Sequence, residues 1–171
     1  AEQYFERKYL KTLTIVIPIY NEKASLEILI QRIHQVLCTA NVQDISYNIL
    51  FVDDGSHDGT HEILQILSSR YSSVGFIRFA RNFGHQAAIL AGMKHCNSDL
   101  VITMDGDLEH PPEHIPKMIQ LWREGNLVVQ AVKSEQSDLT FFKKFTAQIF
   151  YKLFGLISPV NLAPGASDFR L

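Results

Sequence analysis

The sequence predicts an α/β fold, in which a mostly parallel sheet carries helices on both faces. Four apolar runs alternate with stretches whose apolar residues recur three or four positions apart. The runs end in polar or acidic residues, which is typical of buried parallel strands. With 171 residues, 46% of them hydrophobic, the chain is long enough to bury one core. We therefore expect a single domain over residues 1–171.

Five strands and five helices are predicted in order along the chain. The strands are expected at residues 13–18, 47–52, 74–79, 100–104 and 127–132. The helices are expected at residues 24–37, 58–68, 85–95, 111–123 and 138–157. The first helix shows the clearest helical spacing, with apolar residues at Leu26, Leu29, Ile30, Ile33 and Leu37. Ligands of such folds bind beyond the carboxyl ends of the strands, so we expect functional residues directly after the strands.

Composition excludes several classes of protein. A formal net charge of -2 and a sequence pI near 6.4 provide no basic surface for nucleic acid. Cys38 and Cys96 form no CxxC pair, which argues against a disulfide framework and fits a reducing setting. No stretch reaches the roughly 20 apolar residues of a spanning helix, and residues 1–11 are too charged for a signal peptide. Because the sequence lacks an initial Met and ends abruptly, we expect it to be part of a longer protein.

Acidic residues follow three of the predicted strands. They stand in the segments Tyr20-Asn21-Glu22, Asp53-Asp54-Gly55-Ser56 and Asp105-Gly106-Asp107-Leu108-Glu109. The carboxyl ends of parallel strands lie on one rim of a sheet, so these carboxylates are expected to gather there. They would repel one another strongly unless a cation or hydrogen-bond donors from a ligand offset their charge. A divalent cation is the expected partner, and Mg²⁺ and Mn²⁺ both prefer such oxygen ligands.

The pair Asp105 and Asp107 is the most informative element. One carboxylate can hold a ribose while the other holds a cation that bridges diphosphate oxygens, and Glu109 can add a ligand. Gly106 between them would let the backbone approach a ligand closely. The alternative is a surface turn with solvated carboxylates, but the apolar run at residues 100–104 directly before the pair favours the functional interpretation.

The other polar positions have structural alternatives. Ser56 or Asp58 can cap the next helix, although capping does not explain why two adjacent acids, Asp53 and Asp54, end a strand. One of these two can accept a hydrogen bond from a nucleobase. Glu22 can be an ordinary residue of a first helical turn. The histidine pairs, His57 with His61 and His110 with His114, have zinc-like spacing. The first pair has no third ligand nearby in sequence and Pro111-Pro112 interrupts the second, so solvated histidines are expected.

Four ordered motifs make the chain resemble the inverting family 2 glycosyltransferases. They read IPIYNE at residues 17–22, VDDGSHDGT at 52–60, RNFGHQAA at 81–88 and MDGDLEHPPE at 104–113. Two segments, DGDLEHPPE at residues 105–113 and the closing GASDFRL at 165–171, are most similar to the polyprenyl-phosphate glycosyltransferases, the group of dolichol-phosphate mannose synthase and bactoprenol glucosyltransferase. The resemblance covers nearly all of residues 13–171. It implies the GT-A fold, which is Rossmann-like, with the nucleotide-sugar core at residues 12–135.

The resemblance also implies roles for individual residues. The nucleotide-sugar donor would be bound by Pro18, Tyr20, Glu22, Asp53, Asp54, Asn82, Asp105, Gly106 and Asp107. The metal ion, Mg²⁺ or Mn²⁺, would be held chiefly by Asp107, with Asp105 and Glu109 assisting. The family usually has Gln in place of Glu109, and it tends to have Arg where this chain has Lys133. Lysine offers a point charge in place of a bidentate fork, so the resemblance implies no phosphate clamp there.

The implied reaction is an in-line displacement with inversion, from a UDP- or GDP-sugar to a polyprenyl phosphate. Asp168 is the candidate base or orienting group and Arg170 the candidate partner of the acceptor phosphate, unless they form a structural ion pair. Residues 158–171 would form a loop on the acceptor side. The helix at 138–157 has an apolar aromatic stripe beside lysines, which suits a membrane surface as well as a core. The full-length protein is expected to be anchored to the cytoplasmic face of a membrane by later helices.

Other classes fit the sequence less well. A haloacid dehalogenase phosphatase carries its nucleophilic Asp after the first strand, and a receiver-type signalling domain needs a lone Asp after a middle strand. Here the third strand ends in Phe79-Ala80-Arg81-Asn82. A dinucleotide-binding oxidoreductase needs GxGxxG after the first strand, where this chain has IPIYNE. A family 2 enzyme with a saccharide acceptor stays an alternative, and the sugar, the nucleotide and any homo-oligomer are left open.

Overall fold

The computed structural model describes residues 11–40, 42, 44–132 and 166–171. Within them the strands are β1 (Lys11–Ile19), β2 (Ile45–Asp53), β3 (Val74–Arg78), β4 (Leu100–Thr103), β5 (Gln130–Val132) and β6 (Ala166–Arg170). The helices are α1 (Leu26–Thr39), α2 (Thr60–Arg70), α3 (His85–His95) and α4 (Ile115–Arg123), with a 3₁₀ turn at Pro112–His114 before α4. None of these helices has the length and hydrophobicity needed to cross a bilayer.

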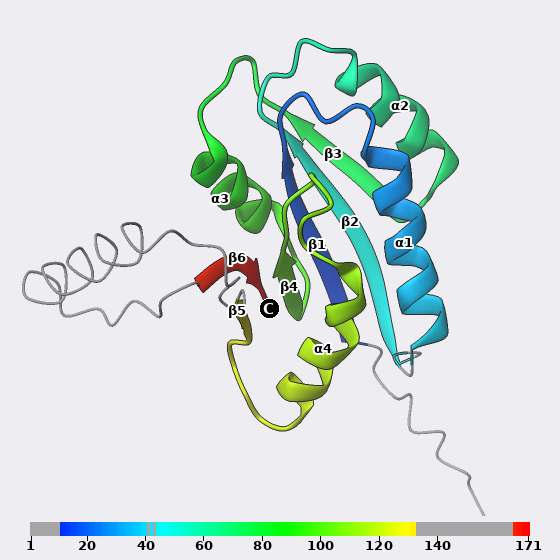
Figure 1. The fold of residues 1–171 in the computed structure, drawn as a ribbon, viewed down its shortest axis with the longest axis vertical. Helices are drawn as coiled ribbons and strands as arrows, with labels where there is room; N and C mark the ends of the chain where they lie inside the picture. Colours follow the sequence, from blue (N-terminus) through cyan, green and yellow to red (C-terminus); the bar gives the residue numbers. More distant parts are fainter. Residues whose placement is uncertain (1–10, 41, 43, 133–165) are drawn as a thin grey trace, which may run out of the picture. The chain divides into compact units, whose positions relative to one another are not determined.

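The described strands form one sheet in the order β3-β2-β1-β4-β6-β5 (Figure 1). β1 pairs in parallel with β2 and with β4, and β2 pairs in parallel with β3. β6 pairs with β4 in the antiparallel sense, at Thr103 and Arg170. The sheet is therefore mostly parallel, which confirms the α/β class expected from the sequence.

The chain divides into two compact units, Ala1–Val129 with Phe169–Leu171, and Gln130–Asp168. The first unit contains the four parallel strands and the four helices. The described part of the second unit is limited to residues 130–132 and 166–168. The predicted helix at 138–157, Lys133, and the start of the predicted acceptor-side loop lie outside the described residues.

Helices cover both faces of the sheet in the first unit. In Figure 1, α3 lies across the sheet from α1, and α1 contacts both α2 and α4. The core strand β1 is buried from Leu13 to Ile19, because it lies in the middle of the sheet under helices on both sides. α3 packs very close to β1, since a Cβ at Gly92 would lie 2.3 Å from Val16 Cγ1. Gly92 therefore lets α3 lie directly against the centre of the sheet.

Two expectations about the end of the chain were wrong. The fifth strand does not cover residues 127–132, since Leu127 and Val128 are exposed and β5 begins at Gln130. Residues 166–170 are strand β6 and do not belong to a loop, because Arg170 pairs with Thr103 and Leu171 exchanges two backbone hydrogen bonds with Val129. Both errors come from pairing between segments far apart in the sequence, which no local pattern records.

Candidate active site

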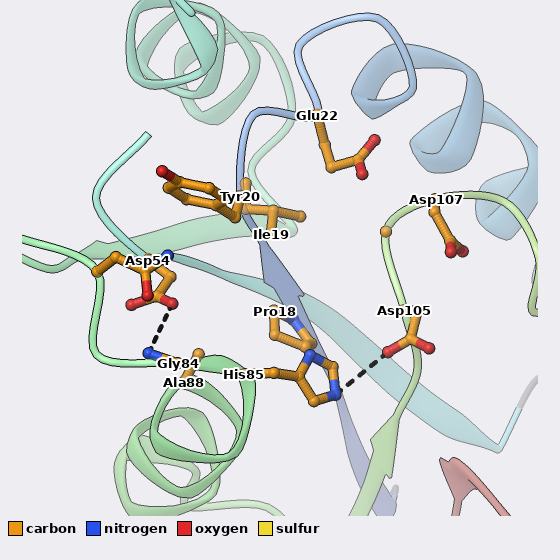
Figure 2. Close-up of a pocket in the computed structure, with 12 residues that line it drawn as sticks. Pro18, Ile19, Tyr20, Glu22, Asp54, Gly84, His85, Ala88, Asp105 and Asp107 are labelled. Atoms are coloured by element: carbon orange, nitrogen blue, oxygen red, sulfur yellow. Dashed lines mark hydrogen bonds and ion pairs between the residues drawn. The ribbon is translucent and has the colours of Figure 1, made fainter. Parts of the chain in front are cut away.

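A pocket of about 400 Å³ opens at the carboxyl ends of β1, β2 and β4, beside the start of α3 (Figure 2). Most residues that the sequence predicted for nucleotide-sugar binding line it: Pro18, Tyr20, Glu22, Asp54, Asn82, Asp105, Gly106 and Asp107. The lining also includes Ile19, Gly84, His85 and Ala88, which belong to the motifs at residues 17–22 and 81–88 but were given no role of their own. Asp53 and Glu109 are not among the lining residues.

The segment after β1 is held in place by the segment after β2. The backbone N–H of Asn21 donates to Ser56 Oγ at 2.9 Å, and Asn21 Oδ1 accepts the N–H of His57 at 2.9 Å. Asn21 has a positive φ of 58°, a left-handed conformation that Asn tolerates better than most residues. This turn leaves Tyr20 45% exposed at the pocket.

The two acids at the end of β2, Asp53 in its last position and Asp54 directly after it, are buried and bind backbone groups. Asp54 Oδ1 accepts the N–H of Phe83 at 2.7 Å, and its Oδ2 accepts the N–H of Gly84 at 2.9 Å. Asp53 Oδ1 accepts the N–H of Ser56 at 2.9 Å, while its Oδ2 lies 3.6 Å from Arg78 Nε. These contacts account for the adjacent acids as loop anchors. The predicted contact of either residue with a nucleotide stays a prediction.

Gly55 allows the segment after β3 to approach β2. Its φ is +75°, and a Cβ there would lie 2.6 Å from the carbonyl carbon of Arg81 and 2.9 Å from the backbone nitrogen of Asn82. No side chain fits between these two backbones. The close approach brings Asn82 and Gly84 to the pocket, although β3 itself carries no acid at its end.

The segment after β4 forms a tight loop that carries Asp105 and Asp107. Asp107 Oδ1 accepts the N–H of Glu109 at 2.9 Å, and Leu108 takes a left-handed conformation with φ of 68°. A Cβ at Gly106 would lie 2.6 Å from Ile19 Cγ2. The absence of a side chain at Gly106 therefore lets the loop pack on β1, a reason the sequence analysis did not foresee.

Asp105 lies between two imidazoles. Its Oδ1 is 3.5 Å from His85 Nε2, as Figure 2 shows, and its Oδ2 is 3.4 Å from His110 Nδ1. The backbone N–H of Asp105 also donates to His110 Nδ1 at 2.9 Å. Nδ1 accepts this N–H, so the same nitrogen does not also donate to Oδ2.

His110 is 5% exposed and stacks on Phe169 of β6, with ring centroids 5.4 Å apart and an interplanar angle of 17°. The expectation that His110 is solvated was therefore wrong. His57 and His114 are exposed, as expected. The sequence signal for His110 was weak, because Phe169, which covers its ring, is nearly sixty positions away.

The described residues contain no group of three or more His, Cys, Asp or Glu side chains arranged to hold a metal ion. Asp105 Oδ1 is nevertheless buried without a hydrogen bond among the described residues, and Asp107 is exposed at the same pocket. An unsatisfied buried carboxylate oxygen beside a second carboxylate fits a hard cation that takes its remaining ligands from water and phosphate.

The two residues predicted for the acceptor lie in β6. Arg170 is exposed and its backbone pairs with Thr103, two positions before Asp105. Asp168 is partly buried and belongs to the second compact unit. Their predicted roles stay predictions.

Comparisons with known proteins agree on the family. The family model described as glycosyl transferase family 2 matches residues 14–169. An uncharacterized glycosyltransferase of Bacillus subtilis (strain 168) is 41% identical over 92% of this chain and 48% of that protein. A bactoprenol glucosyl transferase of Shigella phage SfX is 34% identical over 93% of this chain and 51% of that protein.

An undecaprenyl-phosphate 4-deoxy-4-formamido-L-arabinose transferase of Aeromonas hydrophila is 37% identical over 84% of this chain and 43% of that protein. The chain thus spans about half the length of the curated relatives it matches. Among solved structures, a mannosyltransferase of Pyrobaculum calidifontis in complex with GDP-Man and Mn²⁺ is similar, with a TM-score of 0.60 and 18% identity over 74% of this chain and 36% of that chain. At this low identity the likeness shows the fold alone, which is the GT-A fold. Because the family model and the relatives each cover most of this chain, the chain belongs to glycosyltransferase family 2.

Proposed function

We propose that this chain transfers a sugar from a UDP- or GDP-sugar to a polyprenyl phosphate, with inversion and with the help of Mg²⁺ or Mn²⁺. The observation that carries the proposal is the pair Asp105 and Asp107, which line one pocket together with Tyr20 and Glu22. The pocket's volume of about 400 Å³ lies in the range of small-molecule sites.

The donor fits the chemistry of this lining. The half-exposed ring of Tyr20 offers a face on which a nucleobase can stack. Asp105 would accept hydrogen bonds from the ribose hydroxyls, and Asp107 would bind the cation on the diphosphate. Pro18, Gly106 and Asn82 would provide the remaining walls of the donor site. Asp53, which is fully buried, would act on the nucleobase only through the loops it anchors.

The cation would be held by Asp107 and Asp105, with Glu109 available from the same loop. A bound Mg²⁺ or Mn²⁺ would neutralise the charge on the departing nucleoside diphosphate. The few protein ligands suit these ions, which commonly keep waters and substrate phosphates in their shell. Glu109 stands where the family usually has Gln, so this site would carry one more negative charge than those of its relatives.

The acceptor proposal rests on the relatives named for bactoprenol and undecaprenyl phosphate. A phosphate monoester has its second pKa at about 6, so the acceptor is mostly dianionic near pH 7. One of its oxygens would attack the anomeric carbon, a new C–O bond would form, and the bond to the diphosphate would break. No proton has to be removed, so Asp168 would orient the acceptor and Arg170 would bind its phosphate.

A lipid acceptor would place the enzyme at a membrane. We infer the cytoplasmic face, where nucleotide sugars are available, with the segment at 138–157 as the part that would lie in the interface. The curated relatives are about twice as long as this chain, which leaves room in a longer protein for a membrane anchor.

A transfer assay tests the proposal. The chain is incubated with Mn²⁺, radiolabelled UDP- or GDP-sugars, and undecaprenyl phosphate in detergent, and the label that moves into organic solvent is measured. We expect labelled lipid with one donor class, and none with undecaprenol, which has the same chain but no phosphate. Equal labelling of undecaprenol would contradict the phosphate acceptor. Transfer to a saccharide acceptor alone would replace the lipid by the alternative acceptor class.

A further inference from the structure

We propose that His110 is a positioning residue, which fixes the backbone of Asp105 and so sets where the carboxylates of Asp105 and Asp107 stand in the pocket. This inference rests on the proposed function, in which these two carboxylates bind the nucleotide and the cation. It concerns a residue that does not line the pocket and would not touch the substrate.

The first step is the hydrogen bond from the Asp105 backbone to the imidazole. The N–H of Asp105 donates to His110 Nδ1 at 2.9 Å, which closes a ring from residue 105 to residue 110. An N–H in this part-buried position is costly to leave without an acceptor, so the contact holds the backbone at Asp105 in place. The side chain of Asp105 leaves the backbone at that point and faces His85 across the pocket.

The second step is that the imidazole itself is fixed. His110 is 5% exposed, and its ring stacks on Phe169, which is 1% exposed. The backbone that carries Phe169 is held in turn, because Arg170 pairs with Thr103 and Leu171 exchanges backbone hydrogen bonds of 2.8 Å with Val129. The stacking therefore fixes the plane of the His110 ring, and the hydrogen bond from the Asp105 N–H selects the orientation in which Nδ1 faces that backbone.

The loop between Asp105 and His110 is held by the same hydrogen bond. Asp107 Oδ1 accepts the N–H of Glu109, and Leu108 is left-handed, a conformation that residues other than Gly, Asn and Asp avoid. Such a loop persists only where its surroundings hold it. The hydrogen bond from the Asp105 N–H to His110 joins the two ends of this loop. Without it, the carboxylate of Asp107 would lose its fixed position as well.

A packing role for His110 makes different predictions, and two variants separate the roles. His110→Phe keeps an aromatic ring against Phe169 but removes the acceptor. His110→Asn removes the ring but places an amide oxygen near the position of Nδ1. A positioning role predicts that His110→Asn binds Mn²⁺ and nucleotide more tightly than His110→Phe, and a packing role predicts the reverse.

Two quantities are measured for each variant. The affinity for Mn²⁺ in the presence of UDP or GDP is determined from the decrease of the free Mn²⁺ signal in electron paramagnetic resonance, and the melting temperature is recorded beside it. We expect His110→Phe to bind about 10- to 100-fold more weakly, the usual effect of losing a contact that orients a metal ligand. We expect His110→Asn to recover most of the affinity even if it melts at a lower temperature. His114→Phe is the matched control, since His114 is exposed and should leave affinity unchanged.

Unchanged affinity in His110→Phe, or affinities that simply follow the melting temperatures, would overturn the inference. A wild-type chain that binds no nucleotide with Mn²⁺ would instead contradict the proposed function. In that case the rate of hydrogen exchange at the Asp105 amide still tests whether His110 holds the backbone of Asp105. Exchange should be faster in His110→Phe than in the wild type or His110→Asn, and equal rates in all three would refute the positioning role.

Discussion

Gly106 lies where β1 leaves no room for a side chain. A Cβ at this position would lie 2.6 Å from Ile19 Cγ2 and 3.5 Å from both Ile17 Cγ2 and the Pro18 carbonyl oxygen. Ile19 is 2% exposed, and its branched methyl group cannot turn away without disturbing the core. Because Gly106 has no Cβ, the loop that carries the two acids can lie directly against β1.

Gly106→Ala should destabilise the protein by about 1–3 kcal/mol, the usual cost of overpacking a tight core. Denaturant unfolding of the single variants and of the double variant with Ile19→Ala measures this effect. In the Ile19→Ala background the clash is gone, so Gly106→Ala should cost much less there. Equal costs in both backgrounds would show that the contact with Ile19 is not the reason for glycine.

Individual residues show where reasoning from the sequence succeeds and where it stops. The pair Asp105 and Asp107 could be placed at the rim because both follow an apolar strand. The partners of Asp54 could not, since the two N–H groups it binds lie about thirty positions away. The burial of His110 depends on a strand from the end of the chain. Local patterns in the sequence therefore show which residues follow a strand, but they do not show contacts between residues far apart in the chain.

At the scale of elements, the beginning of α3 is tied to the end of β2. Asp54 is 4% exposed and accepts the N–H groups of both Phe83 and Gly84, directly before the first residue of the helix. His85, which faces Asp105, follows these two residues. The carboxylate of Asp54 therefore determines the position of one wall of the pocket.

Asp54→Asn should loosen this connection, because the amide keeps one acceptor and turns an N–H₂ group toward the other backbone N–H. We expect a loss of about 1–3 kcal/mol, the cost of a buried unsatisfied polar group. Hydrogen exchange should become faster at Phe83 and Gly84, while the amides of β1 keep their protection until global unfolding. Unchanged exchange at these two amides would contradict the anchoring role.

The beginning of β4 is tied to the beginning of β1 by Asp99. Its Oδ1 accepts a hydrogen bond from Lys11 Nζ at 2.7 Å. Its Oδ2 accepts hydrogen bonds from the backbone N–H and the hydroxyl of Thr12 at 2.9 and 3.0 Å. The hydrogen bonds from Lys11 and then Thr12 lower the pKa of Asp99 to about 2. The pKa in the folded protein is below that in the unfolded chain, so this contribution to stability is present above about pH 4 and is lost as the pH falls through 2.

Asp99→Asn should therefore melt at a lower temperature than the wild type at pH 7, and the difference should close between about pH 4 and pH 2. The effect should be small and should weaken with salt, because the pair is exposed. Melting curves across this pH range test the expectation. A difference that stays constant down to pH 2 would show that the charge of Asp99 has no part in it.

For the whole molecule, the order of the strands explains why one rim carries the site. β1 lies between β2 and β4, so the segments after these three strands meet, and the segment after β3 reaches them over Gly55. The sequence predicted the α/β class and the rim, because alternation of strands and helices fixes the direction of parallel strands. It did not predict β6, whose pairing with β4 joins residues far apart in the chain.

The central claim is that the rim binds a nucleotide together with a divalent cation through Asp107. The most direct measurement is the melting temperature of the chain with UDP or GDP, with and without Mn²⁺, for the wild type and Asp107→Asn. A ligand at a hundred times its Kd adds about 2.7 kcal/mol, which is roughly 5–10 °C for a protein of this size. We predict such a rise for one nucleotide in the wild type, only with Mn²⁺, and its loss in Asp107→Asn. A rise of the same size without Mn²⁺, or an unchanged rise in Asp107→Asn, would contradict the claim.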